Sequence, residues 1–134
     1  MPHAKSLPMH WRRIPQWYRL EGSVCEKCGE YYFPNRVICP QCRRHGKIVP
    51  VKFSGSGEIY SYTVVHVPPT GMELEKPYVL GIIKLAEGPK VTAQIVDCEP
   101  GGIKIGQKVE ATLRKIREVG DEGIIQYGYK FQLA

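Results

Sequence analysis

The sequence has no apolar run long enough to cross a membrane. Its longest runs, such as Tyr78 to Ile83, fall far short of the roughly 18–20 residues that a membrane span needs. The first residues, Met-Pro-His-Ala-Lys, also lack the apolar segment of a secretory signal. We therefore expect a cytoplasmic protein with no membrane contact.

Recognisable catalytic motifs are also missing. The sequence contains neither a phosphate-binding P-loop nor a GxSxG nucleophile elbow. The four histidines lie in separate segments, and His66, which follows a strand beside a Pro-Pro-Thr-Gly loop, is expected to be an ordinary surface histidine. Cys98 lies between Asp97 and Glu99, whose carboxylates would raise the pKa of a thiol. We expect Cys98 to be a small buried apolar residue and the chain not to be an independent enzyme.

Acidic residues are scarce in the first part of the chain. Residues 1–52 contain ten Lys or Arg and three Glu, a balance of +7. Residues 53–134 contain nine Lys or Arg and ten Asp or Glu, a balance of −1. The positive charge is therefore expected on the N-terminal part of the molecule.

Four cysteines form the strongest motif. Cys25 and Cys28 make one CxxC pair, Cys39 and Cys42 make another, and ten residues separate the pairs. Each pair is expected to form a tight turn with backbone N–H groups directed at its sulfurs, and two such turns complete a closed tetrahedral shell of four thiolates. Gly29 is expected to take a left-handed conformation after the first pair. We predict structural zinc, although iron uses the same shell, and a redox pair or an empty site is a weaker alternative.

The rest of the chain favours a mainly β fold. Residues 1–22 are expected to form an arm and two short helices that meet near Ile14–Pro15, with Gly22 as the C-terminal cap. Residues 23–50 form the cysteine module, and residues 51–134 have the composition of a β domain. That domain contains five strand candidates, which suit an OB-type barrel: Glu58–Val67, Tyr78–Leu85, Lys90–Asp97, Lys108–Arg117 and Ile124–Leu133.

Several longer motifs resemble a known family. They are Trp11-Arg12, Tyr18-Arg19-Leu20-Glu21-Gly22, the two CxxC pairs with Phe33-Pro34-x-Arg36 between them, and the strand from Gly57 to His66. Together they resemble the family catalogued as domain of unknown function thirty-five. The resemblance implies a helical hairpin, a rubredoxin-like zinc ribbon and an OB-fold barrel. One departure is that no glycine directly follows Cys42.

The resemblance also implies a function. Family members look like non-catalytic scaffold subunits in archaea that bind acetoacetyl-CoA thiolase and hydroxymethylglutaryl-CoA synthase, or related acyltransferases, and help to hold CoA. The aromatic and basic residues of the N-terminal part suit protein interfaces and CoA phosphates. The candidate CoA or partner contacts are Arg12, Arg13, Trp17, Arg19, Tyr32, Phe33 and Arg36. The alternative is that these aromatic residues pack the helices against the ribbon and the cations face water.

A second hypothesis is binding of single-stranded nucleic acid. Tyr60, Tyr62, Tyr127 and Tyr129 could stack bases on the barrel. Phosphate neutralisation supplies most of the non-specific affinity, however, and the barrel half carries a balance of −1. The sequence therefore favours the scaffold role.

Overall fold

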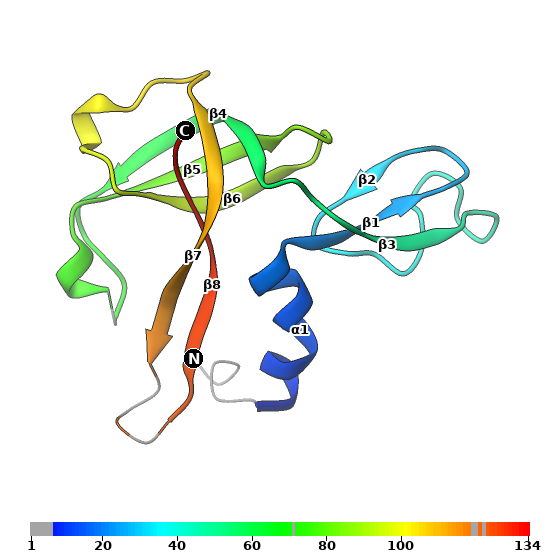
Figure 1. Ribbon diagram of the computed structural model, residues 1–134, viewed down its shortest axis with the longest axis horizontal. Helices are drawn as coiled ribbons and strands as arrows, with labels where there is room; N and C mark the ends of the chain where they lie inside the picture. The colour runs from blue at the N-terminus through cyan, green and yellow to red at the C-terminus, as the bar shows by residue number, and fades with distance from the viewer. Residues whose placement is uncertain (1–6, 71, 119–120, 122) are drawn as a thin grey trace.

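The computed structural model describes residues 7–70, 72–118, 121 and 123–134. These residues form a β-barrel, a three-stranded ribbon that projects from it, and one α-helix beside the barrel (Figure 1). The predicted mainly β class, with a zinc ribbon followed by an OB-type barrel, is confirmed. No helix in these ranges has the length and apolar character needed to span a bilayer.

The barrel contains the five strands that the sequence predicts. They are β4 (Ser56–Val65), β5 (Tyr78–Leu85), β6 (Lys90–Val96), β7 (Lys108–Glu118) and β8 (Ile125–Leu133). They close in the order β4-β5-β6-β8-β7, and every pair is antiparallel except β6 with β8. Alternate residues of β5, among them Val79, Ile83 and Leu85, point into the core. Two short 3₁₀ turns, η2 (Glu73–Glu75) and η3 (Pro100–Gly102), lie in the connections.

The N-terminal segment differs from the prediction. The described residues contain one continuous helix, α1 (Leu7–Arg19), with Pro15 inside it, and so the expected pair of short helices is wrong. Pro15 removes only one amide donor, which would have bonded the carbonyl of Trp11, and Trp11 is 75% exposed. Packing of α1 against β8 compensates for the missing bond, since tertiary contacts supply most helix stability in proteins.

Gly22 is not the cap of this helix. Leu20 takes the left-handed conformation after Arg19, with φ 51°, and its side chain is buried in the barrel core. Gly22 instead lies inside β1 (Glu21–Cys25), where a Cβ atom would collide with the Phe53 ring and the Tyr32 carbonyl oxygen. Glycine is therefore needed here for close packing rather than for ending the helix.

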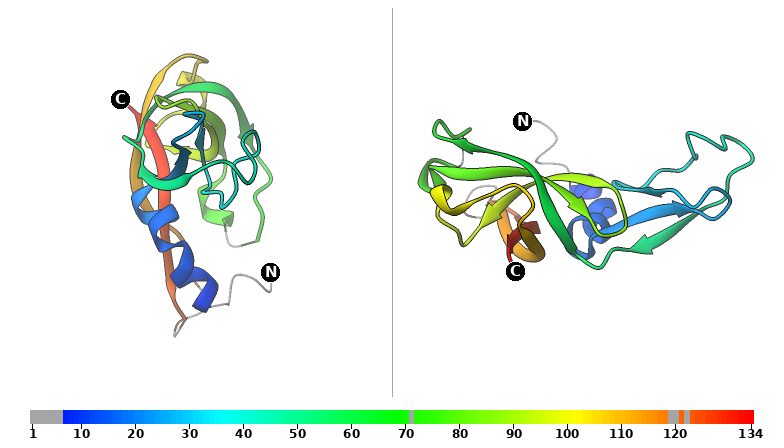
Figure 2. Two further views of the ribbon diagram at one scale, coloured as in Figure 1. Left: turned by 90° about the vertical axis from the view of Figure 1, so that its right-hand side faces the viewer. Right: turned by 90° about the horizontal axis from the view of Figure 1, so that it is seen from above.

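The ribbon sheet has the order β2-β1-β3, with β2 at Tyr31–Tyr32 and β3 at Ile48–Lys52. Seen from above, it extends away from the barrel as a narrow arm (Figure 2). Its base is attached through aromatic contacts. The ring of Phe33 lies 5.9 Å from that of Phe53 and 5.5 Å from that of Tyr129 in β8. The ribbon is thus joined to the barrel by packed side chains as well as by the chain itself.

Candidate functional site

The four predicted ligands meet at one point in the ribbon. The Sγ atoms of Cys25, Cys28, Cys39 and Cys42 all lie within 4.8 Å of one another, and those of Cys28 and Cys39 are 3.6 Å apart. A Zn–S bond of about 2.3 Å in a tetrahedron separates the sulfurs by about 3.8 Å. The four thiols therefore fit one tetrahedral metal ion, which they would enclose completely.

Two tight turns hold the sulfurs in place. In the first, Gly29 donates its amide to the Cys25 carbonyl at 2.7 Å and has φ 76°, which confirms its expected left-handed conformation. In the second, Arg43 donates to the Cys39 carbonyl at 2.8 Å and has φ 53°. Arg43, which directly follows Cys42, therefore takes the left-handed conformation that Gly29 takes in the first turn.

Gly46 has a packing role that the sequence does not reveal. A Cβ atom at this position would lie 2.9 Å from the Cβ of Cys39 and 3.0 Å from that of Cys42. Both distances are shorter than side chains tolerate in a packed interior. Gly46 allows the chain to pass directly over the two ligands of the second turn.

Hydrogen bonds stabilise the thiolate form of the first cysteine in each pair. The Cys42 amide and the Tyr32 hydroxyl donate to Cys39 Sγ, both at 3.4 Å, and lower the pKa of Cys39 to about 6. The pKa of Cys25 is lowered mainly by the backbone amide of Cys28. These bonds favour the metal-binding thiolate form at Cys39 and Cys25, whereas burial and the neighbouring thiols raise the pKa of Cys42 to about 12.

Tyr32 and Arg36, two of the predicted contact residues, lie at the metal site. Tyr32 bonds Cys39 and so supports a ligand from outside the first coordination shell. The Arg36 guanidinium lies 5.4 Å from the centre of the Tyr32 ring, and the Arg36 amide donates to Ser23 Oγ at 3.0 Å. The structure therefore assigns Tyr32 a supporting role that sequence reasoning missed.

The other predicted contact residues lie on α1 and at the base of the ribbon. Arg12 is exposed, Arg13 lies 5.8 Å from the Trp17 ring, and Arg19 pairs with Glu21 at 3.0 Å. Phe33 belongs to the junction between ribbon and barrel. The seven residues thus divide between the helix and the ribbon rather than forming one patch of direct contacts.

The residues of the rival hypotheses are divided. Tyr60, Tyr62 and Tyr127 are exposed, as base stacking requires. Tyr129 packs against Phe33 and Phe131 beside the core, so it is not free to stack on a base. His66 is exposed. Cys98 is partly buried, and burial followed by the charge of Asp97 raises the pKa of its thiol. This environment suits the expected packing role of Cys98 and not that of a nucleophile.

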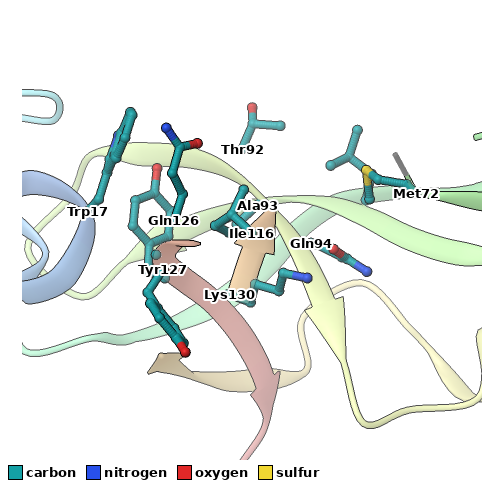
Figure 3. Close-up of a pocket in the computed structure, with 12 residues that line it drawn as sticks. Trp17, Met72, Thr92, Ala93, Gln94, Ile116, Gln126, Tyr127 and Lys130 are labelled. Atoms are coloured by element: carbon teal, nitrogen blue, oxygen red, sulfur yellow. The ribbon is translucent and has the colours of Figure 1, made fainter. Parts of the chain in front are cut away.

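A cavity of about 300 Å³ lies between α1, the barrel wall and the β7–β8 hairpin. Trp17 stands at one end and Met72 at the other, with Ile116, Tyr127 and Lys130 between them (Figure 3). Its lining comes from distant parts of the chain, and so no local motif marks it. The nearest sequence signal is the stripe Gln126, Gly128 and Lys130, which alternates with three aromatic residues in β8.

Two family models match the chain. One is described as the rubredoxin-like zinc ribbon domain of ChsH2 and matches residues 14–47. The other is described as the C-terminal OB-fold domain of ChsH2 and matches residues 50–114. The four-cysteine cluster falls within the first range, which supports zinc as the metal, and the second range covers strands β4 to β6 and the first part of β7.

Individual relatives agree with these matches. A DUF35 domain-containing scaffold protein from Methanothermobacter thermautotrophicus is 52% identical over 122 residues, 91% of this chain and 92% of the relative. A probable enoyl-CoA hydratase alpha subunit from Thermomonospora curvata is 32% identical over 99 residues, 74% of this chain and 30% of the relative. A solved structure described as an Ltp2-ChsH2(DUF35) aldolase matches with TM-score 0.72 and 28% identity, covering 94% of this chain and 92% of the solved one.

Proposed function

Because this chain belongs to the DUF35 family, catalogued as domain of unknown function thirty-five, we propose that it is a non-catalytic scaffold subunit. In this proposal it binds a thiolase-like acyl-CoA enzyme, of the acetoacetyl-CoA thiolase or hydroxymethylglutaryl-CoA synthase type, and helps to hold CoA. The names of the relatives support an enzyme partner, since one is called a scaffold protein and a solved relative is described as an Ltp2-ChsH2(DUF35) aldolase. The enoyl-CoA hydratase subunit supports acyl-CoA chemistry in that partner.

The closed metal site is the observation that carries the non-catalytic role. The four thiolates would occupy all four positions of a tetrahedral zinc ion and would leave none for water or substrate. Zinc at Cys25, Cys28, Cys39 and Cys42 would supply folding energy to the ribbon rather than a Lewis acid to a reaction.

The helix α1 supports binding to a protein or to an anionic ligand. Trp11 is 75% exposed, and its neighbours Arg12 and Arg13 are also exposed. Exposed tryptophan and arginine are the side chains that most often dominate protein interfaces. The two guanidinium groups also suit the phosphates of CoA, which they would bind by paired hydrogen bonds.

Co-purification from native cells tests the enzyme partner. The tagged full-length chain should recover a thiolase-like enzyme in stoichiometric amount at moderate salt, identified by mass spectrometry of the bound proteins. Recovery of the chain alone, at low salt as well, would reject the scaffold role.

Titration with CoA tests the ligand role. Replacing Arg12 and Arg13 with Ala should weaken CoA binding by about tenfold or more, because each charged hydrogen bond contributes about 1.5–3 kcal/mol. The matched control replaces Lys84 and Lys104, two exposed lysines of the barrel half, with Ala. Equal CoA affinity in both double variants would mean that CoA is not held by α1.

A further inference from the structure

Strands β6 and β8 are paired over only a short length. They run parallel and meet at two residue pairs, Ile95 with Phe131 and Val96 with Gln132. Before that junction, residues 90–94 of β6 pair only with β5, and residues 127–130 of β8 pair only with β7. Within the described part of the chain, each of these segments therefore leaves one strand edge without a ladder partner.

The cavity beside Trp17 lies in this opening. Its lining includes three consecutive residues of β6, Thr92–Gln94, and five consecutive residues of β8, Gln126–Lys130. Successive side chains of a strand point to opposite faces, so a cavity over one face would be lined by every second residue. Consecutive lining residues therefore indicate that the backbone edge of the strand faces the cavity. We call this opening the β6–β8 groove (Figure 3).

The surface of the groove is mainly apolar, and its polar side chains are those of Thr92, Gln94, Gln126 and Lys130. Trp17, Leu80 and Ile116 form much of its wall. Lys130 is 6% exposed, and its Nζ lies 3.5 Å from Glu75 Oε2. The same Glu75 oxygen accepts a closer bond, at 2.9 Å, from Gln94 Nε2. An ammonium group has three N–H donors, and so Lys130 keeps donors for a further acceptor.

We propose that the β6–β8 groove binds an extended, apolar segment of the partner enzyme that carries one acidic residue. This proposal rests on the scaffold function and names a surface for it. Strand edges offer amide and carbonyl groups at a fixed spacing, and an extended polypeptide is the ligand that matches that spacing. An acidic residue in the segment complements Lys130 and the neighbouring helix α1, which contains three arginines and no acidic residue.

Peptide binding to the full-length, ¹⁵N-labelled chain tests the groove without the enzyme. The probe is Ac-Val-Leu-Asp-Leu-Val-amide, and the control peptide has proline in place of both leucines, which removes two amide donors. The probe should shift the amide signals of Thr92, Gln94 and Gly128 saturably and slow their hydrogen exchange. The proline peptide should bind at least about tenfold more weakly. Equal binding of the two peptides, or no saturable shift at millimolar peptide, would overturn the proposal.

Variants identify the contacts. Lys130→Met keeps the length of the side chain but removes its charge, and it should weaken the Asp peptide about tenfold while leaving an Asn version unchanged. Ile105→Ala removes an exposed apolar side chain that does not line the groove and should change neither affinity. Hexanoate is a further probe. If hexanoate shifts these amides and the peptide does not, the groove binds small carboxylates and the peptide proposal is wrong.

Enzyme recovery then separates the two proposals. If the tagged wild-type chain recovers a thiolase-like enzyme and Lys130→Met with Trp17→Ala recovers it equally well, the scaffold function stands and the groove assignment is wrong. If no variant recovers an enzyme while the peptide binds, the groove is a peptide site and the scaffold function is wrong.

Discussion

Cys39 is the metal ligand with the most extensive support from its neighbours. It is fully buried and accepts hydrogen bonds from the Cys42 amide and the Tyr32 hydroxyl. Cys98, in contrast, lies outside the cluster and packs against the barrel core, with its Sγ donating to the Ile95 carbonyl at 3.7 Å. The two cysteines therefore make a matched pair for testing the metal site.

We expect Cys39→Ser to abolish tight zinc binding and Cys98→Ser to leave it unchanged. A serine hydroxyl stays protonated and cannot replace a thiolate in the shell. Metal analysis of the purified proteins should find about one zinc per chain in the wild type and in Cys98→Ser. Full zinc content in Cys39→Ser would contradict the four-thiolate site.

Tyr129 should make stability sensitive to high pH. Burial raises the pKa of its hydroxyl to about 12, against about 10 in an unfolded chain. Below pH 10 both states keep the proton; above it the unfolded chain releases the proton first, and so unfolding becomes more favourable as the pH rises. The resulting loss is about 1.4 kcal/mol at pH 11.

The measurement is urea unfolding at pH 9 and pH 11 for the wild type and Tyr129→Phe. The wild type should lose about 1.4 kcal/mol more than the variant between the two pH values. An identical loss in both proteins would mean that Tyr129 titrates normally.

The connection between ribbon and barrel depends on a few aromatic side chains. Phe33 follows β2 and packs between Phe53 and Tyr129. We expect Phe33→Ala to lower the free energy of unfolding by about 2 kcal/mol, less than for a fully buried phenylalanine because Phe33 is only partly buried. Val37→Ala, at a position that is 90% exposed, should change it by less than about 0.5 kcal/mol. Denaturant unfolding of the zinc-loaded proteins measures both, and equal effects would reject the proposed junction.

The barrel strands could be predicted closely because their signals are local. Apolar residues alternate clearly in β6 and β8, turns rich in Gly and Pro separate the strands, and the predicted and observed bounds of β5 are identical. The helix could not be predicted as well. Pro15 and Gly22 are strong local signals for a helix end. Packing against β8 nevertheless stabilises a helix that continues through Pro15, and α1 ends at Arg19, before Leu20 in its left-handed conformation. Tertiary contacts overrode the local preference at both positions.

The same distinction holds for the sites. The metal ligands were predictable because each CxxC turn places its two sulfurs within a segment of only four residues. The supporting bond from Tyr32 depends on how β2 is placed over the second turn, and no spacing rule gives that. The β6–β8 groove arises only after the barrel closes, because its lining comes from α1, β5, β6, β7 and β8 together with Met72.

The molecule as a whole consists of a barrel with its own core and a ribbon that depends on metal. The buried apolar cluster includes Ile59, Ile83, Val109 and Phe131 in the barrel strands. The ribbon has a two-residue strand and few buried side chains apart from its cysteines. Small modules of this kind rely on metal for their folding energy.

Chelation should therefore unfold the ribbon and spare the barrel. Removing zinc is expected to collapse the amide signals of residues 23–50 to unfolded positions, because zinc binding supplies roughly 10–16 kcal/mol to such modules. The barrel amides of β5 and β7 should keep their dispersed shifts in the same spectrum. A ribbon that stays fully folded after complete metal removal would contradict the structural role of zinc.

The most direct test of the scaffold role is the native mass of the complex formed by the endogenous chain. Gentle extraction from its own cells, followed by native mass spectrometry, should find the chain with one zinc ion in a complex with a thiolase-like enzyme at a fixed subunit ratio. Detection of the zinc-loaded chain only as a free monomer, under conditions that preserve other complexes of the same extract, would contradict that role.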